Sequence, residues 1–125
     1  MRFLVVDDSA TMRRIIVNSL DRIGYADVVE ADDGASALTK FAEGGIGFII
    51  TDWNMPQMSG LDFARNIRSR ADGATTPILM VTTRSAREDI LAAVEAGVNN
   101  YVLKPFTPTV LKEKIDAVLS VAAAA

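Results

Sequence analysis

The chain has 125 residues, is 50% hydrophobic and carries a net charge of −3 from 13 basic and 16 acidic residues. It contains no cysteine and no histidine, which excludes disulfides, thiol catalysis, Ser-His-Asp catalysis and the usual zinc sites. The mild acidity argues against nucleic-acid binding, which needs a basic face. Chemistry here is therefore expected to use carboxylates, hydroxyls, lysine and a hard metal ion.

The length suits one domain, which we predict to cover residues 1–125 without a repeat or linker. No apolar stretch approaches the ~20 residues that a membrane-spanning helix needs. Asp7-Asp8 also ends the first apolar run before a signal peptide could form. We therefore expect a cytoplasmic protein with no membrane association.

Five short apolar runs alternate with segments of helical spacing. The runs predict strands at residues 3–6, 28–31, 48–52, 77–82 and 101–103. The intervening segments predict helices that follow Ser9, Gly34 and Gly60, and that cover residues 85–96 and 108–121. Ser9 suits the N-cap of the first helix, Gly24 its C-terminal end, and Pro108 the first turn of the last. This alternation predicts an α/β fold with a parallel sheet and helices on both faces.

The helical spacing also predicts which side chains are buried. In the helix at 85–96 these are Ile90, Leu91 and Val94. In the last helix they are Val110, Leu111, Ile115, Val118 and Leu119. Five arginines are assigned to solvated helix faces: Arg13, Arg14, Arg65, Arg68 and Arg70.

Polar residues follow four of the predicted strands. Asp7-Asp8 follows the first, Asp52 ends the third, Thr82 ends the fourth and Lys104 follows the fifth. Taken singly, each has an ordinary explanation as a helix cap, a strand end or a loop residue. In a parallel sheet, however, all these strand ends lie on the edge where open α/β sheets bind ligands. Their coincidence therefore predicts one polar crevice.

The chemistry of this crevice suits phosphoryl transfer to Asp52. Three clustered carboxylates repel one another, and Mg²⁺ relieves that repulsion in an all-oxygen site. Lys104 offers a second positive charge to a phosphoryl group, and Thr82 offers a hydroxyl donor. Catalysis would then consist of positioning and electrostatic stabilisation, with the Asp52 carboxylate as the nucleophile.

Four motifs carry a resemblance to a known family: FLVVDDSATMRR, DWNMPQMSG, PILMVTT and NYVLKPFT. With them the chain resembles the receiver domains of bacterial two-component systems, most closely the chemotaxis response regulators of the CheY family, from Phe3 to about Val121. The resemblance implies a flavodoxin-like (βα)5 fold, a doubly wound five-stranded parallel sheet in the order 2-1-3-4-5.

The resemblance also implies a role for each site residue. Asp52 matches the phosphorylated aspartate, Asp8 the direct Mg²⁺ ligand, Asp7 a ligand acting largely through water, and Asn54 a ligand through its backbone carbonyl. Lys104 matches the phosphate-binding lysine, with a cis bond to Pro105. Thr82 matches the switch hydroxyl and Tyr101 the switch aromatic. The implied partner-binding face comprises Ser85, Arg87, Ile90, Tyr101, Leu103 and Lys114.

The implied partners are a CheA-like sensor histidine kinase, which donates the phosphoryl group, and a FliM-like flagellar motor switch protein. Small donors of the acetyl phosphate type are a further source, and a dedicated phosphatase is left open. We expect a monomeric signalling switch that assists its own Mg²⁺-dependent phosphorylation and dephosphorylation. It is not expected to be an enzyme.

Three alternatives stay open. The first is a phosphate sink that drains the kinase without binding the motor. The second is an Asp-dependent phosphatase with Asp7 as nucleophile, a chemistry that typically needs an acid where this chain has Ser9. The third is flavin binding, although the Asp7-Asp8 loop would repel a flavin phosphate.

Overall fold

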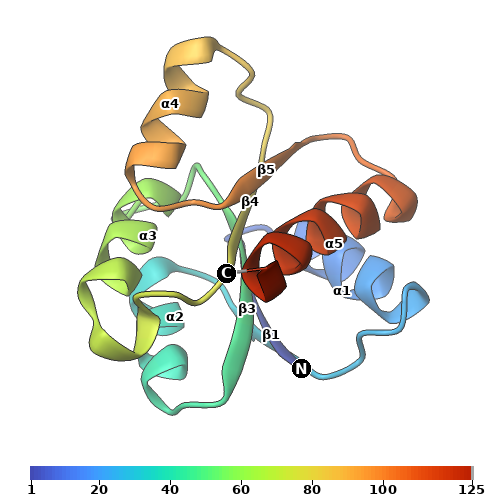
Figure 1. Ribbon diagram of the computed structural model, residues 1–125, viewed down its shortest axis with the longest axis horizontal. Coiled ribbons are helices and arrows are strands. Elements are labelled where there is room, and N and C mark those ends of the chain that lie inside the picture. The colour runs from blue at the N-terminus through green and yellow to red at the C-terminus, as the bar shows by residue number, and fades with distance from the viewer. Residues whose placement is uncertain (125) are drawn as a thin grey trace.

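The computed structural model describes residues 1–124, so Ala125, the last residue of the predicted domain, lies outside the described part (Figure 1). Strands alternate with helices along it. The strands are β1 (Arg2–Val6), β2 (Val28–Ala31), β3 (Ile46–Asp52), β4 (Ile78–Thr82) and β5 (Asn100–Leu103). The helices are α1 (Ala10–Arg22), α2 (Gly34–Ala42), α3 (Gly60–Ser69), the short 3-10 turn η1 (Ala71–Gly73), α4 (Arg87–Glu95) and α5 (Pro108–Ala124).

The strands form one parallel sheet in the order β2-β1-β3-β4-β5, which confirms the predicted flavodoxin-like fold. β3 is the central strand. Its residue Thr51 pairs with Val6 of β1, and its last residue, Asp52, pairs with Val81 of β4. The register therefore brings the carboxyl ends of β1, β3 and β4 to the same edge.

Helices cover both faces of the sheet. Because side chains alternate along a strand, Phe3 and Val5 of β1 point to one face, and Leu4 and Val6 to the other. The first face packs against α1 and α5, and the second against α2, α3 and α4, on opposite sides of the sheet in Figure 1. Burial of both faces explains why the strands are almost uniformly apolar.

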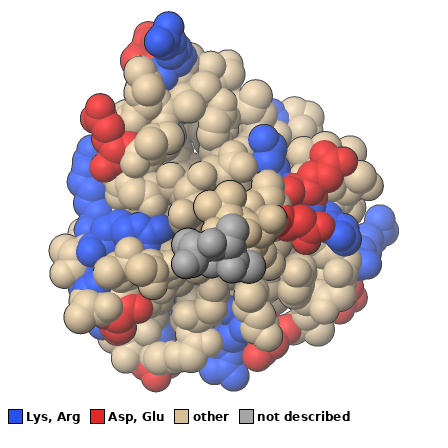
Figure 2. Space-filling view, viewed as in Figure 1, with Lys and Arg blue, Asp and Glu red and all other residues tan. Residues whose placement is uncertain are grey.

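Three of the predicted helix ends are confirmed, whereas α4 begins at Arg87 instead of Ser85 and α5 continues to Ala124 instead of Val121. The Ser9 hydroxyl accepts from the Met12 N–H at 3.2 Å, Gly24 follows α1 with a φ of +100°, and Pro108 is the first residue of α5. None of the described helices has both the length and the apolar character needed to cross a membrane. The molecular face in Figure 2 mixes acidic and basic side chains around its rim instead of gathering one sign.

The prediction for the buried face of α4 was wrong in part. Leu91 is 51% exposed and Val94 is 60% exposed, whereas Ala93 and Ala96 are buried. Ile90 is half-buried. The helix therefore packs its small alanine side chains against the sheet and turns its larger apolar side chains outward. Val110, also predicted to be buried, is exposed at the start of α5.

Three of the arginines that we assigned to solvated faces are half-buried instead, namely Arg13, Arg68 and Arg70, and the first two bind backbone carbonyl oxygens. Arg68 donates hydrogen bonds to the carbonyl oxygens of Gly97, Gly73 and Thr76 and to Oδ1 of Asn99, at 2.6–3.0 Å. Burial lowers the pKa of its guanidinium below the ordinary value. Arg13 of α1 donates to the backbone carbonyl of Asp7 at 2.6 Å. Both side chains fix loops at the ends of strands, a role that residue type and spacing do not reveal.

Candidate functional site

Three carboxylates meet at the carboxyl edge of the sheet. Asp7 and Asp8 follow β1, Asp52 ends β3, and one oxygen from each lies within 4.8 Å of the others. Asp7 and Asp52 are buried, while Asp8 is exposed. The parallel pairing of β1 with β3 produces this juxtaposition, so the predicted crevice is present.

The two oxygens of Asp7 differ in their surroundings. Oδ1 accepts from the Ser9 N–H at 2.9 Å, whereas Oδ2 has no hydrogen-bond partner among the described residues. Burial raises the pKa of Asp7 above its ordinary value; the charges of Asp52 and Asp8 add to this, and the Ser9 N–H and Lys104 oppose it. A buried carboxylate oxygen that accepts no hydrogen bond, beside two further carboxylates, belongs to the kind of donor set that a hard divalent cation prefers.

Lys104 brings a positive charge to the cluster from β5. Its Nζ lies 3.3 Å from Oδ1 of Asp52 and 3.6 Å from Oδ2 of Asp7, and its side chain is only 16% exposed. The backbone helps to aim it, because the Lys104 N–H donates to the Thr82 carbonyl at 2.8 Å. The bond to Pro105 is cis, as the resemblance implies. One ammonium thus neutralises only part of the charge of three carboxylates.

The backbone after Asp52 is held closely. The Trp53 N–H donates to Oδ1 of Asp52 at 2.7 Å, and the Gly60 N–H donates to the Trp53 carbonyl at 2.7 Å. A Cβ at residue 60 would lie 2.0 Å from the Asp52 carbonyl oxygen. Only glycine fits there, so Gly60 is a supporting residue of the site that the sequence analysis treated simply as the end of a loop.

Thr82 and Tyr101 lie on the strands beyond Asp52. Thr82 follows Val81, the partner of Asp52 in β4, and is 2% exposed. Its Oγ1 accepts from the Arg84 N–H at 3.0 Å. Tyr101 pairs with Met80 in β5 and is half-buried. The structure therefore places Thr82 next to the carboxylate cluster and Tyr101 one strand farther out.

Arg84 lies beside the crevice but was not among the predicted site residues. It donates to Oδ1 of Asn54 at 3.1 Å, and its guanidinium carbon lies 4.8 Å from the centre of the Trp53 ring. These residues and Asp8 line a hollow beside the carboxylate cluster. The Asn54 side chain is thus engaged with Arg84, and the binding of metal by its backbone carbonyl stays a prediction from the resemblance.

The residues predicted to form a partner-binding face are distributed over α4, β5 and α5. Those with exposed side chains are Ser85, Arg87 and Leu103. Those with half-buried side chains are Ile90, Tyr101 and Lys114. With Leu91 and Val94 also exposed on α4, this side of the molecule has more apolar surface than the sequence analysis expected.

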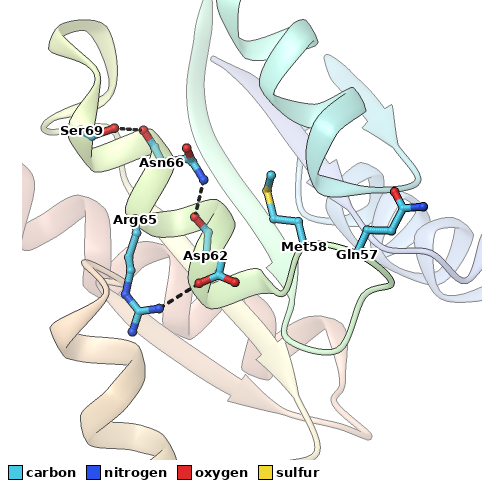
Figure 3. A pocket seen from close by; sticks show the side chains of 6 residues that line it. All are labelled: Gln57, Met58, Asp62, Arg65, Asn66 and Ser69. Carbon is cyan, nitrogen blue, oxygen red and sulfur yellow. Dashed lines mark hydrogen bonds and ion pairs between the residues drawn. The ribbon is translucent and has the colours of Figure 1, made fainter.

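A second hollow runs along α3 and does not include the carboxylate cluster (Figure 3). Arg65 pairs with Asp62 at 3.0 Å, Asn66 donates to the Asp62 carbonyl, and Ser69 donates to the Asn66 carbonyl. These polar groups are satisfied within the helix, so the hollow offers no set of free ligands comparable with the cluster.

Comparison with known proteins agrees with this geometry. Residues 3–116 match the response regulator receiver domain family. The chain belongs to this family. Receiver domains bind Mg²⁺ at an acidic pocket, and the cluster of Asp7, Asp8 and Asp52 is such a pocket.

The receiver domain is 52% identical to chemotaxis protein CheY1 of Helicobacter pylori over 120 residues, or 95% of this chain and 97% of that protein. It is 51% identical to the CheY homolog of Campylobacter jejuni, over 95% of this chain and 92% of that protein. Its structure matches CheY4 of Vibrio cholerae with a TM-score of 0.88 and 35% identity, over 94% and 97% of the two chains. The protein is a CheY-like chemotaxis response regulator, and phosphorylation by a kinase is typical of its family.

Proposed function

We propose that Asp52 accepts a phosphoryl group from the phosphohistidine of a CheA-like sensor kinase, and that the phosphorylated protein binds a FliM-like flagellar motor switch protein. The observation that carries this proposal is the position of Asp52. It ends the central strand within reach of two other carboxylates and 3.3 Å from the Lys104 ammonium. The same position suits small donors of the acetyl phosphate type.

In the transfer step, a carboxylate oxygen of Asp52 attacks the phosphorus atom of the donor. The new O–P bond forms as the P–N bond to the donor imidazole breaks, and the imidazole nitrogen keeps the electron pair and takes up a proton from solvent. Trp53 orients the carboxylate through its N–H, and Lys104 stabilises the charge that spreads over the phosphoryl oxygens.

Magnesium fits the carboxylate cluster. Asp8, Asp52 and the Asn54 carbonyl would hold it directly, and Asp7 largely through water. When bound there, the ion supplies positive charge that offsets the repulsion between the carboxylates and the incoming phosphoryl group. Oδ2 of Asp7, which is buried and accepts no hydrogen bond from the described residues, supports this assignment.

The signalling step depends on Thr82 and Tyr101. The Thr82 hydroxyl donates to an oxygen of the new phosphoryl group, and Tyr101 then rotates into the space that Thr82 leaves. This changes the partner-binding face formed by Ser85, Arg87, Ile90, Tyr101, Leu103 and Lys114. A local change of charge thus biases a two-state element. The protein acts in the cytoplasm as a monomeric, single-domain switch.

Phosphotransfer from radiolabelled kinase tests the phosphoacceptor. Asp52→Asn should abolish labelling, while the control Asp62→Asn, which changes an exposed carboxylate paired with Arg65, should label normally. Normal labelling of Asp52→Asn would contradict the assignment. Turnover of a small phosphoester that is lost in Asp7→Asn but kept in Asp52→Asn would favour the phosphatase alternative instead.

A pulldown with the motor switch protein tests the output. We expect binding to rise when beryllofluoride and Mg²⁺ mimic the phosphorylated state. Equal absence of binding with and without beryllofluoride would favour the phosphate sink.

A further inference from the structure

Helix α4 is less deeply buried than α3, which lies on the same face of the sheet. Among its nine residues only Ala93 is buried, whereas the ten-residue α3 buries Gly60, Phe63, Ala64 and Ile67. Its N-cap residue, Ala86, makes no side-chain capping bond. The first turn of α4 therefore depends on contacts from outside the helix.

The C-terminal end of α4, by contrast, is firmly attached. Arg68 of α3 donates to the Gly97 carbonyl at 3.0 Å and to Oδ1 of Asn99 at 2.9 Å. Oδ1 of Asn99 also accepts from the N–H of Ile78, the first residue of β4, at 2.8 Å. A Cβ at residue 97 would lie 2.5 Å from Cγ of Arg68, so the turn after α4 packs directly on this arginine.

The first turn of α4 is held by Arg84. The guanidinium of Arg84 forms an ion pair with Asp89 at 3.6 Å, stacks over Trp53 and donates to Asn54. We call these three contacts the Arg84 bridge. They connect α4 to the two residues that directly follow Asp52. Figure 2 shows side chains of both charges together at the top of the view, where α4 begins in Figure 1.

The backbone of Arg84 adds a fourth connection. Its N–H donates to Oγ1 of Thr82 at 3.0 Å, so one residue contacts Thr82, the loop after Asp52 and the first turn of α4. The hydroxyl of Thr82 accepts in this bond. A hydroxyl can accept and donate at once, so this bond breaks only when the Thr82 side chain itself moves toward a phosphoryl oxygen, as in the proposed switch.

We propose that Arg84 is a positioning residue that keeps the first turn of α4 in place in the unphosphorylated protein, and that phosphorylation of Asp52 opens the Arg84 bridge. The second half rests on the proposed function. New negative charge at Asp52 competes with Asp89 for the guanidinium, while Thr82 withdraws from the Arg84 N–H. Helix α4 then pivots about the end that Arg68 holds, which moves the exposed Leu91 and Val94.

Hydrogen exchange of the amides in the first turn of α4 measures this directly. Without beryllofluoride, Arg84→Gln should raise the exchange rate about fivefold, the size expected for loss of an exposed ion pair and a cation–π contact. Asp89→Asn removes the ion pair alone and should raise the rate about twofold. The double variant should exceed Arg84→Gln little, because Arg84→Gln already removes the ion pair. Arg84→Lys should restore part of the protection, since it keeps the charge that faces Asp89.

Arg14→Gln is the control, because it removes the same charge from an exposed position on α1 and leaves the Arg84 bridge untouched. It should exchange like the wild type. Beryllofluoride with Mg²⁺ should raise exchange in the wild type and in Arg14→Gln, and add little in Arg84→Gln. Wild-type protection in Arg84→Gln without beryllofluoride would overturn the positioning role.

An unchanged response of Arg84→Gln to beryllofluoride would overturn the link to phosphorylation. Failure of the wild type to take up a phosphoryl group from the kinase would refute the proposed function instead. The comparison of unphosphorylated variants does not depend on phosphorylation and would still decide the positioning role.

Discussion

Replacement of Gly60 by alanine should disturb both stability and phosphorylation, because the new methyl group has no room. Its Cβ would lie 2.0 Å from the Asp52 carbonyl oxygen and 3.0 Å from Cε of Met80. The Met80 methyl is the end of a flexible side chain and can move. The Asp52 carbonyl belongs to the central strand. Its oxygen and the new Cβ would have to move more than 1 Å farther apart to reach an ordinary van der Waals distance.

The cost follows from two contributions. Overpacking of this kind typically costs about 1–3 kcal/mol, and weakening of the 2.7 Å hydrogen bond from the Gly60 N–H to the Trp53 carbonyl adds about 1 kcal/mol. We therefore expect a loss of about 3 kcal/mol in the free energy of unfolding, or about 10 °C in Tm. Since a misplacement of about 1 Å can cost ~10²-fold in rate, phosphotransfer to Asp52 should slow by about that factor.

Urea unfolding and the rate of phosphotransfer from the kinase measure the two effects. Gly47→Ala in β3 is the control, because its Cβ would lie 3.1 Å from Cγ of the flexible Met1 side chain and at an ordinary contact distance of 3.8 Å from the Arg2 carbonyl oxygen. It should keep wild-type stability within about 0.5 kcal/mol and a wild-type rate. If Gly60→Ala behaved like Gly47→Ala in both assays, the argument that close backbone packing positions Asp52 would be refuted.

Three further predictions concern charged groups. Burial raises the pKa of Asp7, so the folded metal-free protein holds the proton of the Asp7 carboxyl more tightly than the unfolded chain does. The contribution of this proton to the stability of the folded state is therefore present in acid and is lost as the pH rises through the folded pKa. Asp7→Asn should therefore stabilise the metal-free protein at neutral pH but not in acid; parallel pH profiles in chemical unfolding would contradict this. Arg68→Lys should cost about 2–4 kcal/mol in urea unfolding, because one ammonium cannot replace four hydrogen bonds to two loops; a change within about 0.5 kcal/mol would show that these bonds contribute little. Lys104→Arg should still be labelled by the kinase but bind the motor switch protein more weakly, because a planar fork does not reproduce a compact ammonium; full binding in the pulldown would refute the role given to the lysine.

The fold was largely predictable, because strand ends and helix caps are encoded locally. Short apolar runs that stop at Asp7, Asp52, Thr82 and Lys104 mark the strands, and parallel pairing then forces these residues together at one edge. The strand order came from the resemblance and not from the residues. Predicting that the three carboxylates meet required both the strand ends, which the residues indicate, and the strand order, which the resemblance implies.

The details of α4 were not predictable from periodicity. Leu91 and Val94 have the same helical spacing as Ala93 and Ala96, and spacing alone does not say which stripe faces the sheet. Apolar character favours the larger side chains, yet the structure buries the alanines. A stripe of large apolar side chains indicates a partner-binding surface only when it is exposed, and here the structure was needed to show that exposure.

The roles of Arg68 and Arg84 were missed for a related reason. Arginine on a helix or in a loop is usually solvated, and its partners here are mostly backbone carbonyls and side chains distant in sequence. Such contacts depend on how loops pack, which no local pattern records. Gly60 was missed as well, because its requirement comes from the approach of the Asp52 carbonyl.

The most direct test of the account is to locate the phosphoryl group after reaction with phosphorylated kinase and Mg²⁺. Rapid proteolysis followed by tandem mass spectrometry of the acyl phosphate assigns it to one peptide. We predict a single phosphoryl group on Asp52, at the end of β3. Modification of Asp7 or Asp8 with Asp52 unmodified would contradict the central claim.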